Sequence, residues 1–194
     1  MKNSIYYATG NPGKVKSLAR EMERYNINVI QIGLDIPEPR SDDVQEIADK
    51  KVIYAYSKIR CPVVALDAGF YIDSLNGFPR AFVNFALDTI GLEGILKLTE
   101  GKDRRCEFRE CLAYLDNNMT PKYFTGHVRG MLATEERGIV KKEQWSKLWM
   151  VFIPDGTDKT LAEMTQEEYN AWREISRAET SPSRQFAEWY VKQK

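Results

Sequence analysis

The chain has 194 residues, of which 43% are hydrophobic and 11% aromatic, as in a globular rather than a disordered protein. Its 28 basic residues balance 28 acidic ones, which excludes a global attraction to nucleic acid or to an anionic membrane, so any anion site must be local. Cys61, Cys106 and Cys111 lack metal-type spacing and are typical of small core residues in a reduced compartment. No apolar run approaches membrane-spanning length. We therefore expect one cytosolic domain, residues 1–194.

The first half of the chain alternates strand and helix patterns. We expect a strand at 4–8, a helix after the break Asn11-Pro12-Gly13, a strand at 27–32, a helix that begins at Asp42 and ends before Pro62, and a strand at 63–66. In the second helix Ile47, Ala48, Val52, Ala55 and Ile59 form one apolar face. The last strand runs directly into Asp67-Ala68-Gly69.

The second half of the chain predicts a long hairpin between helical segments. Its elements are a turn at 76–79, a helix near 84–99, strands at 106–116 and 122–132 joined by Asn117-Asn118, a strand at 149–154, and helices at 160–178 and 183–193. No internal repeat or linker divides the chain. Strands that alternate with helices, together with this hairpin, predict an α/β (mixed α+β) fold with a mixed sheet.

The turn after the first strand is a candidate anion site. Thr9, Asn11 and Lys14 fall where a strand ends and a helix begins, and there free backbone N–H groups and the helix dipole favour an anion. The spacing is not that of a Walker A loop. The alternative is an ordinary structural turn, because Gly and Pro punctuate turns throughout proteins.

Two carboxylates and a lysine form the second candidate group. Asp67 ends an apolar strand, a position where α/β proteins place ligand-contacting groups, although it could equally order the turn. Glu38, between two prolines, is either a metal ligand or a solvated loop acid, and two carboxylates suit Mg²⁺. Lys51 lies off the apolar face of its helix, as a surface lysine would. His127, the only histidine, has no readable acid–base partner, so we expect a structural role.

The order of short motifs resembles that of the inosine triphosphate pyrophosphatase family, which hydrolyses non-canonical purine nucleoside triphosphates. The motifs are ATGNPGK at 8–14, IPEP at 36–39, EIADKK at 46–51, LDAGFYIDSLNGFP at 66–79, FTGHVRG at 124–130, RG at 137–138, FIPDG at 152–156, and then Thr160, Ala162, Glu163, Met164 and Asn170. They span almost the whole chain, and their order is more specific than any single piece.

The resemblance implies a fold, a reaction and a set of site residues. The fold would be a long twisted mixed sheet with flanking helices, forming two lobes around a cleft. Substrate would contact Thr9, Gly10, Asn11, Lys14, Lys51, Ala68 and Gly69, with Lys14 and Lys51 as catalytic cations; Glu38 and Asp67 would hold Mg²⁺, and Asp67 would activate the attacking water. Attack on the α-phosphorus would release a nucleoside monophosphate and pyrophosphate. Members of the family are commonly homodimers.

The departures from the family pattern concentrate on the residues that read the base. One carboxylate is replaced by Leu66, and a Pro-Gly turn becomes Pro79-Arg80. The segment QWSKLWMV (144–151) replaces an aromatic-Gly-aromatic-Asp-Pro motif. Tyr169 occupies the position of a lysine in the family pattern. Of the family's terminal Ser-His-Arg motif, only Arg184 remains.

These departures predict an active pyrophosphatase with altered base specificity. Trp145 or Trp149 would replace the missing stacking ring, the alternative for both being core packing. Arg80 is either a surface residue or a new phosphate or base contact. The competing function is a nucleotide-binding protein without turnover, which the missing carboxylate at Leu66 favours.

Overall fold

The structure is a computed structural model that describes residues 4–37, 39–139 and 144–193. The chain divides into two compact units. Unit 1 takes the described residues of Met1–Ala68, Glu110–Gly126 and Glu179–Lys194, and unit 2 takes those of Gly69–Arg109 and His127–Ala178. Glu38, one of the predicted metal ligands, lies outside the described residues.

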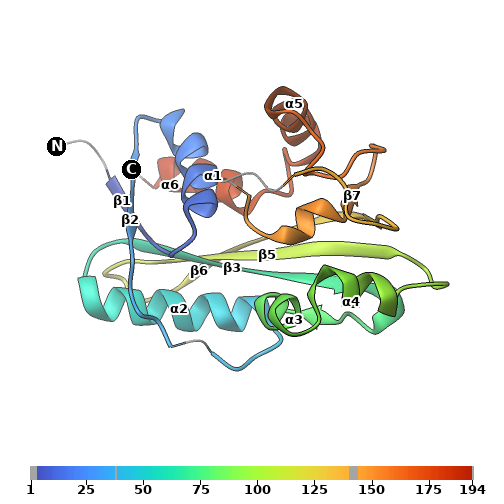
Figure 1. The fold of residues 1–194 in the computed structure, drawn as a ribbon. Coiled ribbons are helices and arrows are strands. Elements are labelled where there is room, and N and C mark those ends of the chain that lie inside the picture. The colour runs from blue at the N-terminus through green and yellow to red at the C-terminus, as the bar shows by residue number, and fades with distance from the viewer. Residues whose placement is uncertain (1–3, 38, 140–143, 194) are drawn as a thin grey trace. The chain divides into compact units, whose positions relative to one another are not determined.

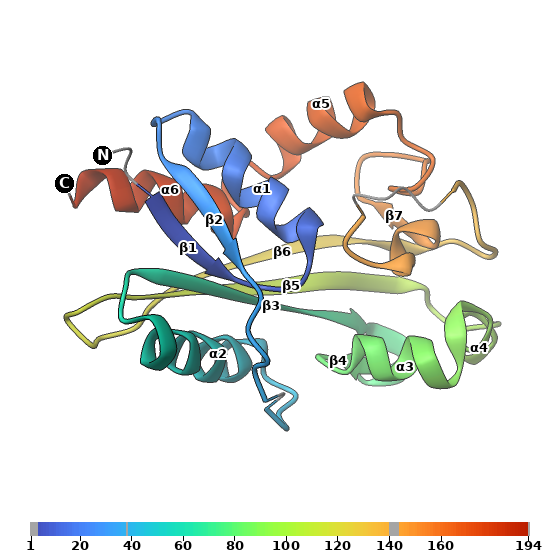
Figure 2. The same cartoon turned by 60° about the vertical axis from the view of Figure 1, so that its left-hand side comes forward.

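The strands form a mixed sheet, as the sequence predicts. They are β1 (Ser4–Ala8), β2 (Asn28–Ile32), β3 (Val63–Ile72), β4 (Pro79–Arg80), β5 (Arg105–Leu115), β6 (Lys122–Leu132) and β7 (Phe152–Pro154). These strands are shown in Figure 1 apart from β4, which Figure 2 labels. Their order is β2-β1-β3-β5-β6-β7, and β4 pairs with β3. β1 is parallel to both β2 and β3, whereas β4 is antiparallel to β3 and β7 to β6. This arrangement confirms the predicted α/β fold with a mixed sheet.

Unit 1 packs helices against both faces of its strands. Its helices are α1 (Pro12–Glu23), α2 (Val44–Ile59) and α6 (Pro182–Lys192). Figures 1 and 2 show α2 on one side of β3 and β5, with α1 and α6 on the other side. Of the apolar face predicted for α2, Ile47, Ala48, Val52 and Ala55 are buried. The helix begins at Val44 rather than at Asp42, because the side chain of Asp43 caps it by accepting from the Gln45 N–H.

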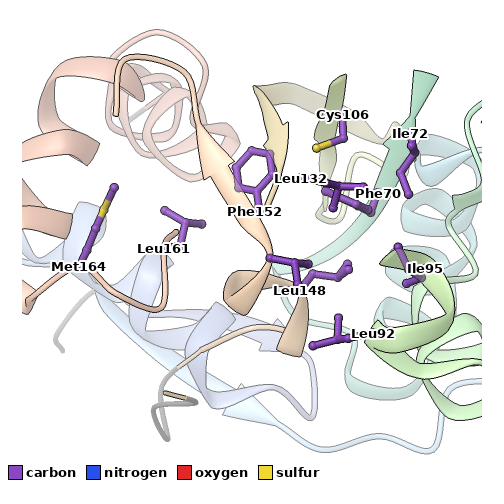
Figure 3. Packing of buried hydrophobic residues seen from close by; sticks show 11 residues of the cluster. Phe70, Ile72, Leu92, Ile95, Cys106, Leu132, Leu148, Phe152, Leu161 and Met164 are labelled. Atoms are coloured by element: carbon purple, nitrogen blue, oxygen red, sulfur yellow. The ribbon is translucent and has the colours of Figure 1, made fainter. Parts of the chain in front are cut away.

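Unit 2 gathers its own hydrophobic core around β7. Its helices are η1 (Asp73–Leu75), α3 (Val83–Thr89), α4 (Gly91–Leu98), η2 (Lys147–Met150) and α5 (Gln166–Ser176). Figure 3 shows the core side chains, which come from β3, β5, β6, β7, α4, η2 and the turn before α5. Phe152 of β7 is fully buried, and its ring lies 5.9 Å from that of Phe70 and 4.9 Å from that of Phe108.

Three sequence predictions in unit 2 are wrong in detail. The helix predicted at 84–99 is two helices, because Gly91 adopts φ +66, which a right-handed helix cannot continue. The strand predicted at 149–154 is the short helix η2 followed by a three-residue strand, β7. The helix predicted from 160 begins at Gln166, where Thr165 and Glu168 form a capping box.

The strand predicted at 63–66 continues to Ile72, so Asp67 lies inside β3 rather than at its end. The backbone of β4 approaches β3 closely at Gly69, where an added Cβ would lie 2.8 Å from the Arg80 carbonyl oxygen. Glycine therefore lets the strand extend and pair with β4, through Phe70 opposite Arg80. Across the described residues we find no helix long and apolar enough to cross a membrane.

Candidate active site

The turn between β1 and α1 is organised by its own side chains. Asn11 is the N-cap of α1, and its Oδ1 accepts hydrogen bonds from the backbone N–H groups of Gly13 at 3.0 Å and Lys14 at 3.2 Å. The backbone N–H of Asn11 donates to Thr9 Oγ1 at 3.1 Å, and that of Val15 donates to the Asn11 carbonyl. Pro12 has no N–H and suits the first helical position.

These bonds correct one sequence expectation about the turn. The backbone N–H groups of Gly13 and Lys14 are not free for an anion, because the Asn11 side chain already accepts from them. The side-chain donors that this turn can offer to a phosphate are the Thr9 hydroxyl, the Asn11 amide and the Lys14 ammonium. Thr9 and Asn11 are half-buried and Gly10 is exposed.

Parallel pairing brings the end of β1 beside the middle of β3. Tyr7 lies opposite Val64 in the β1–β3 register, so Thr9 and Leu66, each two residues further on, stand at the same level. Lys14 extends from the first turn of α1 and donates from Nζ to the Leu66 carbonyl oxygen at 3.2 Å. The ammonium group of Lys14 thus contacts the residue directly before Asp67.

A second lysine reaches the same part of β3 from α2. Lys51 Nζ lies 2.7 Å from Asp67 Oδ1, with 17% of the Lys51 side chain and 10% of the Asp67 side chain exposed. Lys51 is therefore not a solvated surface residue. Two ammonium groups from different helices meet adjacent residues of one strand, next to a buried carboxylate.

Unit 1 also buries an acid that no sequence motif indicated. Glu110 of β5 is 6% exposed. Burial raises the pKa of Tyr7, and the negative charges of Glu110 and Asp67 raise it further. The pKa of the Cys111 thiol is likewise raised, to about 12, by burial and then by the charges of Asp43, Asp67 and Asp49. The sequence signal that could have indicated the burial of Glu110 is its position directly before the apolar run at 111–115.

The described residues could bind Mg²⁺ only where few of its ligands come from the protein. Within the part of the chain that the structure describes, no three or more His, Cys, Asp or Glu side chains gather where they could hold a metal. Mg²⁺ in nucleotide enzymes is bound by one or two carboxylates together with water and phosphate oxygens. Asp67 is a carboxylate that could take this role.

The other predicted substrate residues divide between the two units. In unit 1, Ala68 is half-buried in β3, and Arg184 lies in the first turn of α6 with its Nε 3.4 Å from Glu188 Oε1. In unit 2, Gly69 lies in β3, and Arg80 is exposed and donates from Nη2 to the Asn76 carbonyl oxygen at 3.3 Å. Trp145 and Trp149, also in unit 2, are half-buried.

Trp149 and Tyr169, two residues that depart from the family pattern, contact each other in unit 2. The Trp149 ring lies 5.1 Å from that of Tyr169, and Tyr169 in turn lies 5.8 Å from Trp172. All three rings pack against the core of unit 2. Trp149 therefore contributes to the core, as the packing alternative predicts, while remaining only partly buried.

Several family motifs serve the fold of unit 2. The Arg137 guanidinium pairs with Glu163 at 2.9 Å, and Glu163 Oε2 accepts from the Thr160 N–H at 2.8 Å. The Thr160 hydroxyl donates to the Arg137 carbonyl at 3.1 Å. These motif residues hold the loop before α5 to the segment after β6.

The fold and the site define an α/β protein in which a lysine from α1 and a lysine from α2 converge on β3, beside its buried aspartate. The family comparison agrees: residues 5–181 match the model of the Ham1 family, and the chain belongs to that family. The family resemblance predicted from the motifs is thereby confirmed.

Relatives match along most of the chain. The dITP/XTP pyrophosphatase of Methanopyrus kandleri is 40% identical over 187 residues, covering 96% of this chain and 95% of that protein. The dITP/XTP pyrophosphatase of Thermococcus kodakarensis is 35% identical over 186 residues, covering 95% of this chain and 96% of that protein.

Solved structures share the fold. A Ham1 protein from Staphylococcus aureus superposes with a TM-score of 0.78 at 24% identity, covering 99% of this chain and all of that one (100%). A HAM1 protein from Coxiella burnetii gives a TM-score of 0.79 at 22% identity, covering 98% of this chain and 99% of that one.

Proposed function

We propose that this protein is a nucleoside triphosphate pyrophosphatase, which hydrolyses its substrate to a nucleoside monophosphate and pyrophosphate. The observation that carries the proposal is the convergence of Lys14 and Lys51 on Leu66 and Asp67 of β3. Phosphoryl transfer requires positioning and neutralisation of charge more than covalent chemistry, and two ammonium groups supply both. The names of the relatives, dITP/XTP pyrophosphatases, point to the same reaction.

In the proposed reaction the oxygen of a water molecule attacks the α-phosphorus. The bond between the α-phosphorus and the oxygen bridging to the β-phosphorus breaks, and pyrophosphate leaves with the bonding electron pair. Asp67 takes the proton of the attacking water. Lys51 donates to Asp67 Oδ1, which orients the carboxylate and leaves Oδ2 as the oxygen that accepts the proton. Lys14, with the Thr9 hydroxyl and the Asn11 amide, would hold the phosphate oxygens.

We propose that the reaction depends on Mg²⁺, held by Asp67 together with Glu38. When bound, the ion would neutralise phosphate charge that the two lysines do not neutralise alone. The support is chemical: a carboxylate in a phosphate-binding environment suits a hard cation that keeps several waters and phosphate oxygens.

We further propose that the substrate carries a non-canonical or modified purine, and that the preference among bases differs from that of the typical family member. Arg80, Trp145, Trp149 and Arg184 are the further proposed substrate contacts, of which Arg80 would touch either a phosphate or the base. The contact between Trp149 and Tyr169, two positions that depart from the family pattern, supports a changed aromatic surface in unit 2. The homodimer and the cytosolic location stay predictions, and light scattering of the purified protein tests the first.

The decisive experiment measures pyrophosphate release with Mg²⁺ over a panel of canonical, deaminated and modified nucleoside triphosphates. The Asp67→Asn variant and a reaction with excess chelator serve as controls. Turnover of one or a few substrates, lost in both controls, supports the enzyme and identifies the base. Binding of triphosphates without turnover across the whole panel would instead establish a nucleotide-binding protein and overturn the proposal.

A further inference from the structure

A hydrogen bond in unit 1 joins α2 to a strand that carries none of the proposed site residues. The Tyr123 hydroxyl of β6 donates to Asp49 Oδ1 of α2 at 2.7 Å, and both residues are half-buried. Burial, followed by the hydrogen bond to Asp49, raises the pKa of Tyr123 to about 12. The phenol therefore keeps its proton and remains a donor throughout the physiological pH range.

Asp49 and Lys51 leave α2 in different directions. Two residues correspond to about 200° around an α-helix, so the two side chains stand on opposite flanks of the buried stripe formed by Ala48, Val52 and Ala55. On one flank Asp49 contacts Tyr123, and on the other Lys51 contacts Asp67.

The two contacts reach different strands of the sheet. Asp67 lies in β3 and Tyr123 in β6, and β5 lies between these strands. Neighbouring strands are about 4.8 Å apart, so the two anchors stand roughly 10 Å apart across the sheet. Figures 1 and 2 show α2 lying along these strands.

An apolar stripe alone leaves a helix some freedom to roll on a sheet, because dispersion contacts are non-directional and individually weak. A directional polar contact on each flank removes that freedom. Rolling α2 away from Tyr123 would displace the Lys51 ammonium along Asp67, and small displacements of a positioning group cost large factors in rate.

We propose that Tyr123, through Asp49, is a positioning residue that sets the rotation of α2 and thereby the placement of Lys51 on Asp67. This inference rests on the proposed function, in which Lys51 and Asp67 act on the substrate. Tyr123 itself touches neither the substrate nor the reacting atoms in this assignment.

The test compares Tyr123→Phe with a matched control, Tyr114→Phe. Tyr114 also donates to an aspartate, Asp116 Oδ2 at 3.1 Å, but this acceptor lies just after the end of β5 and the bond does not involve α2. We expect Tyr123→Phe to lower kcat for pyrophosphate release about 10- to 100-fold, and Tyr114→Phe to leave it within about twofold. Asp49→Asn keeps an acceptor for Tyr123 and should retain most activity, whereas Asp49→Leu should match Tyr123→Phe.

A double-mutant cycle separates positioning from general loss of structure. In a Lys51→Met background, Tyr123→Phe should cause no further loss of kcat, because the group that it places is gone. If the fold-changes in kcat caused by Lys51→Met and Tyr123→Phe multiply in the double variant, the inference is overturned. Equal effects of Tyr123→Phe and Tyr114→Phe on kcat would also overturn it.

Amide hydrogen exchange provides a readout that does not need activity. Tyr123→Phe should speed exchange of the amides of residues 47–52 relative to wild type and to Tyr114→Phe. A wild-type protein without turnover would overturn the proposed function, and with it the catalytic meaning of Tyr123, while unchanged exchange in α2 would overturn the positioning role by itself.

Discussion

Lys51 Nζ and Asp67 Oδ1 lie 2.7 Å apart and form an ion pair that is mostly buried, between helix α2 and the middle of strand β3. The pair joins two residues that stand 16 positions apart in the chain. Removing one member of a buried pair costs about 3–5 kcal/mol, because the other charge stays buried without compensation. The same contact therefore bears on both the stability of unit 1 and the proposed chemistry.

Replacement of the proposed base should separate binding from turnover. We expect Asp67→Asn to lower kcat by about 10²- to 10⁴-fold, the usual contribution of a general base, while a triphosphate still binds. Asparagine keeps an oxygen that accepts from Lys51, so folding should survive, which circular dichroism checks. Calorimetric titration measures binding and a pyrophosphate assay measures turnover. Unchanged turnover would remove Asp67 from the mechanism.

Two adjacent lysines of α2 offer a matched comparison. Lys50 pairs with Glu46 on the surface, where each side chain is 49% exposed, and exposed pairs contribute about 0–1 kcal/mol. Lys50→Met should therefore change neither the free energy of unfolding nor kcat appreciably. Lys51→Met should lower both, the unfolding free energy by about 3 kcal/mol. Urea titration and the pyrophosphate assay test this, and equal behaviour of the two variants would contradict a special role for Lys51.

Lys14 should contribute to the binding of the phosphates and not to recognition of the base. A hydrogen bond to a charged group contributes about 1.5–3 kcal/mol, so Lys14→Ala should raise KM roughly 10- to 100-fold for every triphosphate. Lys16→Ala, on the exposed side of the same helix, carries the same change in net charge and serves as the control. A loss confined to one base would show that Lys14 does not act on the phosphates.

Gly10 tests whether substrate approaches the backbone of the β1–α1 turn. Apart from the glycine itself and its two chain neighbours, no atom of the described residues lies within 4 Å of a Cβ added at Gly10 or at Gly33, and neither has a left-handed φ. Gly10→Ala should therefore leave the free energy of unfolding unchanged or raise it by up to about 1 kcal/mol. We expect it nevertheless to raise KM, whereas Gly33→Ala should not. Equal KM values for both variants would mean that the phosphate does not pass close to Gly10.

Stability should fall at alkaline pH. Burial raises the pKa of Cys111 from 9.0 to about 12, so the folded protein holds a proton that the unfolded chain loses in that window. The stabilisation is fully present below pH 9 and is lost as the pH rises towards 12. Urea titrations between pH 7 and 11 should show this decline.

Cys111→Ala is the control for that decline. The free energy of unfolding should drop by a pH-independent amount for the lost packing, while its slope above pH 9 becomes shallower than in wild type. A parallel slope in the two proteins would mean that Cys111 does not contribute to the pH dependence.

Local patterns account for the elements that the sequence predicted well. The bounds of β1 agree with those expected, and the apolar face of α2 follows from a periodicity that the helix itself imposes. Composition and charge balance predicted that any anion site would be local, and the strand–turn–helix at Thr9 to Lys14 is the part of the proposed site that the sequence indicated. These features depend on residues within a few positions of each other.

Pairing between distant segments decided the rest. β3 runs through Asp67 to Ile72 because β4 closes on Gly69, and Lys51 is buried because the fold places α2 over Asp67. The same holds for Glu110, whose burial is set by its place in β5, and for the Tyr123–Asp49 bond, which spans 74 positions. A sequence pattern specifies which face of a helix or strand is apolar. The partner of each polar side chain at the edge of that face depends on which strands become neighbours, and this is decided only by the tertiary packing.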